Sequence, residues 1–179
     1  MTEATDADDI KLQHRAARLA ARAQIRDVRL LRTSAQVHHQ PRSDGGLTYD
    51  IEFTPAVDAD PTATSSFVVR LACRLHIQDR DSAKPDDSSE AARTGELTVA
   101  TAEFEYAGLF EYILREDDAH PSDDEFVAYA STTGRFALYP YIREYVYDLT
   151  GRFALPALTL EVLSRPLPTP PDTSTEKSL

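Results

Sequence analysis

Few residues in this sequence have the types and spacing that catalysis or metal binding requires. His38 and His39 are adjacent, and neighbouring side chains on a strand or loop point apart rather than toward one metal ion. Cys73, the single cysteine, lies within an alternating apolar stretch, where a thiol serves as a small hydrophobic residue rather than a nucleophile. Arg143 and Glu144 fit a surface or interface pair better than a general acid–base couple. We therefore predict a non-enzyme with no catalytic residue, no metal site and no cofactor.

Composition and charge exclude further classes of function. The chain has 179 residues and a formal net charge of −11, whereas nucleic acid and anionic membranes bind basic surfaces. Neither a GxxxxGK[ST] nor a GxGxxG phosphate-binding loop is present. No apolar run is long enough to cross a bilayer, and the acidic N-terminus does not resemble a signal peptide. We expect a cytoplasmic protein that binds neither nucleic acid nor membrane.

The hydrophobic pattern predicts a short helix, four strands and then more helix. Apolar residues at helical spacing indicate a helix over residues 8–23, whose basic side chains (Lys11, Arg15, Arg18, Arg22) we expect to face solvent. Alternating apolar residues predict strands over 24–37, 47–54, 67–77 and 97–110, with a bulge in the first and another near residues 100–102. A run of strands followed by helices favours an α+β fold with an antiparallel sheet.

The helical region and the flanking segments complete this organisation. We predict helix from Phe126, an interruption at Gly134, a second helix over 136–149 with Pro140 near its start, and Gly151 as its C-cap. The polar segment 79–95 is predicted to be a loop. Residues 8–165 then form a single domain, with disordered tails over 1–7 and 166–179.

The sequence LYPYIREYVYDL followed by GRFALPALTL, residues 138–160, resembles the signature of the SecB chaperones. In that family a helix with an L-[FY]-P-Y-x-R-E core leads into a loop of the form F-P-x-L-x-L. The order of four strands and a helix matches over residues 24–163. The segments AARAQIRDVRLLRT and TTGRFALYPYIREYVYDLTGR are similar, in addition, to the SecB-like chaperones encoded with toxin–antitoxin pairs in mycobacteria.

This resemblance implies a four-stranded antiparallel Greek-key sheet with helices on one face. It implies an ATP-independent holdase that binds unfolded or extended polypeptide, most specifically the C-terminal segment of an antitoxin, with exported precursor proteins as broader clients. It also implies a homotetramer, a dimer of dimers that stack through the helix containing Tyr141, Arg143 and Tyr145.

Two departures from the family pattern affect the expected function. The amphipathic helix that follows the apolar loop in SecB is short or missing here, because 161–163 run quickly into RPLPTPP. The loop itself carries about one extra residue within GRFALPAL. The acidic surface by which SecB docks on the translocation ATPase has no identifiable counterpart, so that partner is not assigned.

Apolar side chains from two parts of the chain are expected to line the client groove. They are Tyr49, Ile51 and Phe53 of the second strand and Phe153, Leu155, Leu158, Leu160, Val162 and Leu163 of the loop. We expect the loop residues to be exposed, whereas Ile51 and Phe53 could equally belong to the core. Two other functions stay open: an adaptor for one folded partner, and a ligand-binding or catalytic domain of hot-dog-like shape.

Overall fold

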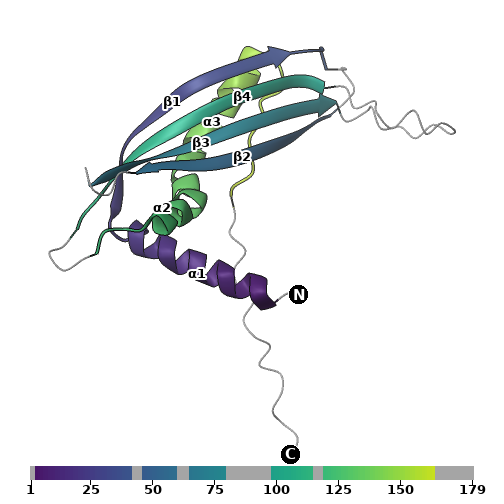
Figure 1. Ribbon diagram of the computed structural model, residues 1–179. Coiled ribbons are helices and arrows are strands. Elements are labelled where there is room, and N and C mark those ends of the chain that lie inside the picture. The colour runs from purple at the N-terminus through teal and green to yellow at the C-terminus, as the bar shows by residue number, and fades with distance from the viewer. Residues whose placement is uncertain (1–2, 42–45, 60–64, 80–97, 115–118, 164–179) are drawn as a thin grey trace, which may run out of the picture.

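An antiparallel sheet of four strands organises the computed structural model, which describes residues 3–41, 46–59, 65–79, 98–114 and 119–163 (Figure 1). Its elements are α1 (Glu3–Ala20), β1 (Ala23–Val37), β2 (Leu47–Ala59), β3 (Ser66–Asp79), β4 (Thr98–Tyr112), α2 (Asp123–Tyr129), the π-helical stretch η3 (Ala130–Gly134) and α3 (Arg135–Arg152). Of the loop predicted over 79–95, Asp79 belongs to β3 and residues 80–95 lie outside the described residues, as does the predicted tail over 166–179.

The strand order is β1-β4-β3-β2, so β2, β3 and β4 form a meander and β1 returns beside β4. This order is that of a Greek key. Figure 1 shows α3 crossing one face of the sheet, while α1 lies beside α2 and away from the strands. The predicted α+β fold, with its antiparallel sheet, short N-terminal helix and C-terminal helix, is confirmed.

The strand alternation places one side chain in two against the helices. On the central strand β3, every second residue from Phe67 to Ile77 is buried, and their cross-strand partners on β4 run from Phe110 to Ala100. The edge strand β2 extends to Ala59, beyond its predicted end at residue 54, and passes through Pro55. An edge strand tolerates a proline because one side of its backbone has no neighbouring strand to bond.

Bulges occur in both strands where the sequence predicts them. In β1 the register shifts between Ile25 and Asp27 and again between Leu30 and Arg32. In β4, Ala100 pairs with Ile77 but Thr98 pairs with Gln78, so Val99 is the extra residue. Such an insertion reverses the alternation locally. This explains why Val99 and Ala100 are both buried although they are adjacent.

An aromatic cluster joins the sheet to α2. The ring of Phe67 lies 5.0 Å from that of Phe126, 5.2 Å from that of Tyr129 and 5.3 Å from that of Phe110, measured between centroids. Phe67, Phe110 and Phe126 are almost completely buried. Each buried aromatic side chain contributes about 1.5–3 kcal/mol through the apolar area it removes from water. The cluster therefore fixes the start of the helical region against the sheet.

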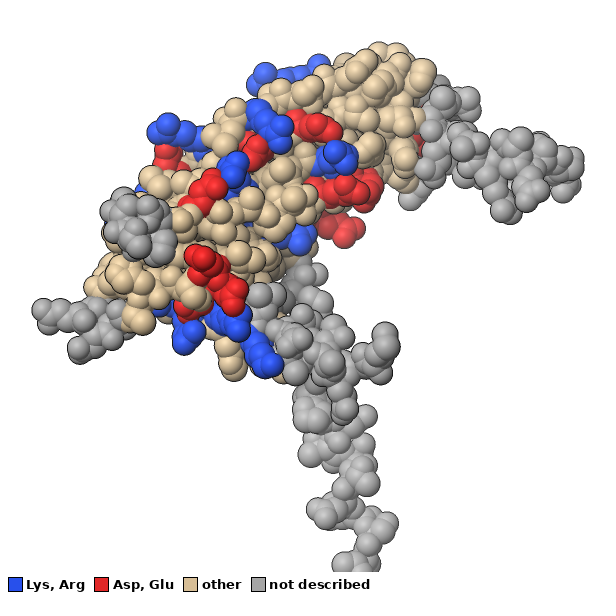
Figure 2. All heavy atoms as spheres, in the orientation of Figure 1, with Lys and Arg blue, Asp and Glu red and all other residues tan. Residues whose placement is uncertain are grey.

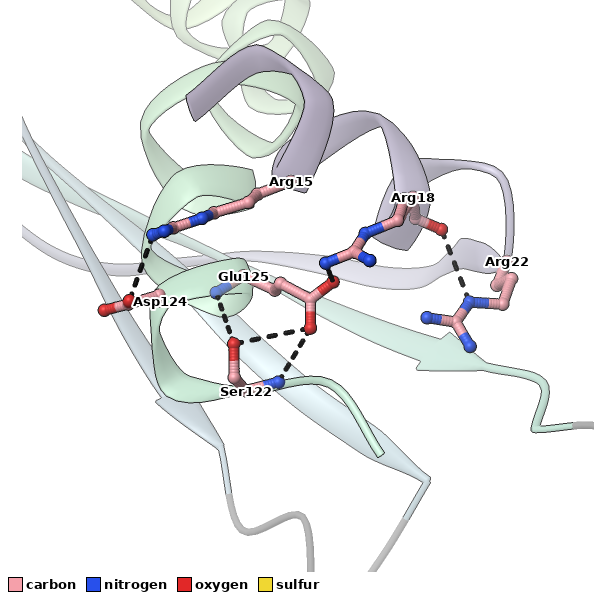
Figure 3. A network of polar contacts seen from close by, with 6 residues as sticks. All are labelled: Arg15, Arg18, Arg22, Ser122, Asp124 and Glu125. Atoms are coloured by element: carbon pink, nitrogen blue, oxygen red, sulfur yellow. Dashed lines mark hydrogen bonds and ion pairs between the residues drawn. The ribbon is translucent and has the colours of Figure 1, made fainter. Parts of the chain in front are cut away.

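The helix α1 begins at Glu3, so residues 3–7 belong to a helix and not to the disordered tail predicted for 1–7. Ala16 and Leu19 of α1 are buried. Two residues of its basic face form ion pairs with α2 while staying exposed: Arg15 lies 3.0 Å from Asp124, and Arg18 lies 2.9 Å from Glu125 (Figure 3). The prediction of a solvent-exposed basic face is confirmed for these two arginines, whose side chains are 45% and 69% exposed.

A capping box starts α2. The Glu125 backbone N–H donates to Ser122 Oγ, and the Ser122 backbone N–H donates to the Glu125 carboxylate (Figure 3). Glu125 thus contacts Ser122 and Arg18 at once. The S-x-x-E spacing of Ser122 and Glu125 is a recognised signal for such a start. It places the beginning of the helix at Asp123, three residues before the predicted one.

The helical region continues without interruption from α2 through η3 into α3. Gly134 has right-handed helical angles and does not break the helix; a Cβ at this position would lie 3.0 Å from Val69, so the glycine serves close packing on β3. Gly151 lies inside α3 and is not its C-cap. The helix is capped by Phe153, and Ala154 adopts the left-handed conformation with φ of 54°.

The sheet face opposite α3 carries paired charges. Arg32 lies 2.7 Å from Glu105, Arg74 lies 3.1 Å from Glu103, and Arg26 lies 2.8 Å from Glu111, each pair joining neighbouring strands. Figure 2 shows basic and acidic side chains interspersed over this face. Exposed pairs of this kind contribute little stability individually. They do leave this face polar, in contrast to the face that α3 covers.

Candidate client-binding site

The edge strand β2 presents a half-buried apolar row toward α3. Tyr49, Ile51 and Phe53 pack against the buried core without being fully enclosed, and the intervening Asp50 and Glu52 are exposed on the opposite face. Pairing with Ile77, Leu75 and Cys73 of β3 sets this orientation. The side chains that the sequence assigns to the client groove on β2 therefore lie on the core side of the sheet, at its edge.

The start of α3 covers the end of this row. The rings of Phe53 and Tyr139 lie 6.0 Å apart between centroids. The guanidinium carbon of Arg135 lies 4.6 Å from the centroid of Phe53, which is the geometry of a cation–π contact. Burial raises the pKa of the Tyr139 hydroxyl, while the positive charges of Arg143 and Arg135 act to lower it.

The segment 153–163 continues from α3 as extended chain and is held by side chains that bind its backbone. The Tyr139 hydroxyl donates to the Glu161 carbonyl, and the Glu161 N–H donates to the Tyr49 hydroxyl at 3.3 Å. Earlier in the segment, the Leu158 N–H donates to Thr150 Oγ1 at 3.1 Å. Two hydroxyls of α3 and one of β2 thus bind this segment without contacting its side chains.

The apolar residues of this segment differ sharply in exposure. Leu155 is 6% and Leu160 is 1% exposed, so the expectation that they face solvent is wrong; both belong to the core. Val162 is 72% exposed, as expected of a loop residue. Phe153, Leu158 and Leu163 are half-buried against the core. The physical reason is that the bonded backbone lies along the protein, which brings four leucines against the core at irregular spacings of three and two residues: Leu155, Leu158, Leu160 and Leu163.

A cavity of about 270 Å³ lies between β2 and the segment 153–163. It brings together two predicted groove residues, Tyr49 and Leu158, from distant parts of the sequence. The other lining residues are Gly46, Leu47, Thr48, Ile77, Thr150, Pro156 and Ala157. Most of this lining is apolar, and the hydroxyls of Tyr49 and Thr150 are polar groups at its surface. Such a cavity accommodates an apolar side chain rather than a highly charged ligand.

Of the three residues predicted to form the oligomer interface, Tyr141 and Tyr145 are about one turn apart on the same side of α3, whereas Arg143 lies on a different side. Residues two positions apart on a helix point in different directions. Tyr141 is 42% exposed, whereas Tyr145 packs against Phe104 with a centroid distance of 4.7 Å and hydrogen-bonds to Thr33. Arg143 is about one helical turn from Tyr139, and its positive charge acts to lower the pKa of the Tyr139 hydroxyl. Two further aromatic residues, Phe136 and Tyr147, are exposed on α3.

The remaining groups that could take part in catalysis or metal binding are Cys73 and the His, Asp and Glu side chains of the described residues. Burial raises the pKa of the Cys73 thiol to about 12, which keeps it protonated and unreactive at neutral pH. Within the described ranges, no group of three or more His, Cys, Asp and Glu side chains could hold a metal ion. Those ranges also hold no helix of the length and apolarity that membrane crossing needs.

Comparison with known proteins identifies the class to which this fold and surface belong. No protein-family model matches the chain. Two relatives from Mycobacterium tuberculosis match over 172 residues, 96% of this chain and 94% of theirs: SecB-like chaperone Rv1957 of strain ATCC 25618 / H37Rv at 63% identity, and SecB-like chaperone MT2006 of strain CDC 1551 / Oshkosh at 62%. The chain belongs to the SecB-like chaperones.

A solved structure agrees with this assignment. It is that of the Mycobacterium tuberculosis Rv1957 SecB-like chaperone in complex with a ChAD peptide from the Rv1956 HigA1 antitoxin. It is 58% identical in sequence, with a TM-score of 0.72, and the match covers 86% of this chain and 99% of that one. The resemblance inferred from residues 138–160 is therefore confirmed at the level of the family.

Sequence reasoning missed the polar residues of the site. Arg135, Tyr139 and Thr150 project from α3 toward β2 and the segment 153–163. Tyr139 follows Arg135 by four residues and Thr150 follows Tyr139 by eleven, and both spacings place side chains on one side of a helix. This pattern can be recognised from the sequence alone. What the sequence lacks is any sign that this side of α3 meets an extended segment of its own chain.

Proposed function

We propose that this protein is an ATP-independent holdase that binds extended polypeptide along β2 and the segment 153–163. The observation that carries this proposal is the half-buried apolar row Tyr49, Ile51 and Phe53, whose first residue lines a cavity together with Leu158. A few apolar client side chains at such a surface, each contributing ~1.5–3 kcal/mol, give micromolar affinity after ordering costs. Holding a client in this way uses no catalytic group.

We infer that the client is the C-terminal segment of an antitoxin. The support is the complex of the Rv1957 chaperone with a peptide of the HigA1 antitoxin, since that chaperone chain is 58% identical to this one. An extended segment suits this surface because backbone groups can be accommodated without a fixed sequence. Delivery of precursors to the export ATPase and a cytoplasmic location stay predictions.

The proposed assembly is a homotetramer formed as a dimer of dimers. Support comes from exposed apolar residues at the sheet edge formed by β1, where Ile25 and Leu30 are 39% and Leu31 is 53% exposed. An apolar strand edge of this kind favours pairing with another chain. The exposed aromatic residues of α3, Tyr141 among them, supply a second surface for stacking.

The first test is suppression of aggregation of a chemically unfolded, unrelated protein, followed by light scattering without ATP. We expect the wild type to protect, and the double variant Leu158→Ser/Val162→Ser to protect less, because both side chains lie beside the proposed surface outside the fully buried core. The matched control is Ile113→Ser/Val127→Ser, which removes two exposed apolar side chains elsewhere.

Each failure has a distinct meaning. Absence of protection by the wild type would reject a general holdase and favour an adaptor for one folded partner. Equal protection by both double variants would place the client surface elsewhere. Direct binding of the HigA1 ChAD peptide, measured by fluorescence anisotropy, tests the client assignment separately, since a general holdase could pass the first test without binding this peptide.

A further inference from the structure

Arg135 is a cation without an anionic partner at the proposed client surface. In the described part of the structure it forms neither an ion pair nor a hydrogen bond, and its Nε is enclosed without a partner. By contrast, many other arginines pair with carboxylates: Arg15, Arg18, Arg26, Arg29, Arg32, Arg70, Arg74 and Arg152. An uncompensated guanidinium is therefore a feature of this site.

The guanidinium is enclosed at Nε, whereas its terminal nitrogens Nη1 and Nη2 are not enclosed and carry the donors that stay available. Its carbon lies 4.6 Å from the centroid of Phe53, so the ring holds the flat face of the group. An arginine stacked in this way still presents its N–H groups at the edge of the plane, in the fork that matches a carboxylate. Phe53 thus holds Arg135 in place without satisfying its hydrogen-bonding groups.

We propose that Arg135 determines client specificity by binding a carboxylate side chain that is flanked by apolar residues in the extended client. This inference rests on the proposed function and goes beyond it, because it names a chemical feature of the preferred segment. Apolar client side chains contact the row on β2, while an aspartate or glutamate of the same segment binds the edge of the Arg135 guanidinium. A partly desolvated charge gains more from an opposite charge than from a neutral carbonyl.

Peptide pairs test this proposal by fluorescence anisotropy. Three labelled peptides share alternating Leu and Phe residues: one has a central Glu, one a central Gln, both with amidated C-termini, and the third has the Gln with a free C-terminal carboxylate. We expect the wild type to bind the Glu peptide roughly three- to tenfold more tightly than the amidated Gln peptide, which is the range of a charge-assisted hydrogen bond partly exposed to water. High salt should reduce this preference.

Variants of three arginines show which side chain causes the preference for the Glu peptide. Arg135→Gln should lose the preference for Glu while still binding the Gln peptide, whereas Arg152→Gln, at the other end of α3, should retain it. Equal affinity of the wild type for all amidated peptides would overturn the proposal, as would a preference lost in Arg143→Gln but kept in Arg135→Gln. Tighter binding of the free-carboxylate peptide alone would assign the site to chain ends and also overturn it. If the wild type bound none of the peptides, the proposed function itself would fail.

Discussion

At the scale of single residues, Leu160 and Val162 show how differently two positions of one extended segment are used. Leu160 is 1% exposed and Val162 is 72% exposed, although both are apolar and two residues apart. The intervening Glu161 is bonded through its backbone to Tyr139 and Tyr49, which holds the segment on the protein. Val162 points away from the core, although Leu163 after it packs against the core again. Two apolar side chains of the same segment therefore differ in how much they stabilise the fold.

We predict that Leu160→Ala lowers the free energy of unfolding by about 2–5 kcal/mol, because it removes a buried side chain and leaves a cavity. Val162→Ala should change it by no more than about 0.5 kcal/mol. Urea unfolding followed by circular dichroism measures both. A small loss for Leu160→Ala would mean that the segment 153–163 does not pack on the core in solution.

Cys73 gives a second prediction at this scale, which concerns alkaline pH. Burial raises the pKa of its thiol from 9.0 to about 12, so the folded state favours the protonated form. The resulting contribution to stability is fully present below about pH 9 and is lost as the pH rises toward 12. We expect the native thiol to resist alkylation at about pH 8 and to react after unfolding in urea.

The pH dependence of unfolding checks the same prediction independently. Between about pH 9 and 11, the urea midpoint of the wild type should fall more steeply than that of Cys73→Ala, which lacks the titrating group. Parallel slopes for the two proteins would show that the thiol pKa is not raised. Rapid labelling of the native protein would show instead that Cys73 is accessible.

At the scale of elements, the helical region shows two glycines with opposite environments. A Cβ on Gly134 would lie 3.0 Å and 3.1 Å from the two methyl groups of Val69 and 3.3 Å from the Tyr129 carbonyl. A Cβ on Gly151 would meet no heavy atom within 4 Å in the described structure. Both residues are helical, so helix propensity favours alanine at each position.

We predict that Gly134→Ala destabilises the protein by roughly 1–3 kcal/mol, because overpacking against the buried, stiff Val69 outweighs the gain in helix propensity. Gly151→Ala should instead stabilise it by roughly 0.5–1 kcal/mol. Differences in thermal midpoint between the two variants provide the measurement. Stabilisation by both substitutions would show that α3 can move away from β3 at little cost.

The elements differ in how far the sequence predicts them. The alternation of residues 67–77 predicts both the strand β3 and its buried face, because an intact period of two leaves no other arrangement of the side chains. Gly134 leads to a wrong prediction because a glycine in a helical pattern usually indicates an interruption of the helix. Here the glycine instead permits close contact between the helical region and β3, a strand far away in the sequence. The burial of Leu155 and Leu160 is likewise unpredictable, since an aperiodic segment becomes core only through what it meets.

The candidate site, too, has some residues that the sequence pattern predicts and others that only tertiary contacts reveal. The apolar row of β2 was predicted from its pattern, and one of its residues, Tyr49, lines the cavity together with Leu158. The use of this surface as a client groove stays a prediction. Arg135 and Tyr139 were not predicted, because their importance depends on the crossing of α3 over Phe53. A one-dimensional pattern indicates which face of an element is apolar but not which other element covers it.

At the scale of the whole molecule, the exposed edge of β1 makes the assembly testable. We predict that the wild type sediments with four times the mass of the chain, and that Leu31→Lys reduces this mass, because it places a charge on the apolar strand edge. Leu109→Lys on the open face of β4 is the control, since it adds the same charge away from the edge. Analytical ultracentrifugation gives the masses. An unchanged tetramer for Leu31→Lys would remove the β1 edge from the interface.

The way in which the segment 153–163 is held has a consequence for how such a protein can diversify. The hydroxyls of Tyr49, Tyr139 and Thr150 bind backbone atoms of Leu158 and Glu161, and a backbone atom is present whatever residue occupies the position. Mutation can therefore alter exposed side chains such as Ala157, Thr159 and Val162 while the segment stays attached. The exposed surface of this segment, which includes Ala157 in the wall of the cavity, can thus be replaced while the frame that holds it stays constant. Lineages can vary the proposed client surface in this way without altering the fold.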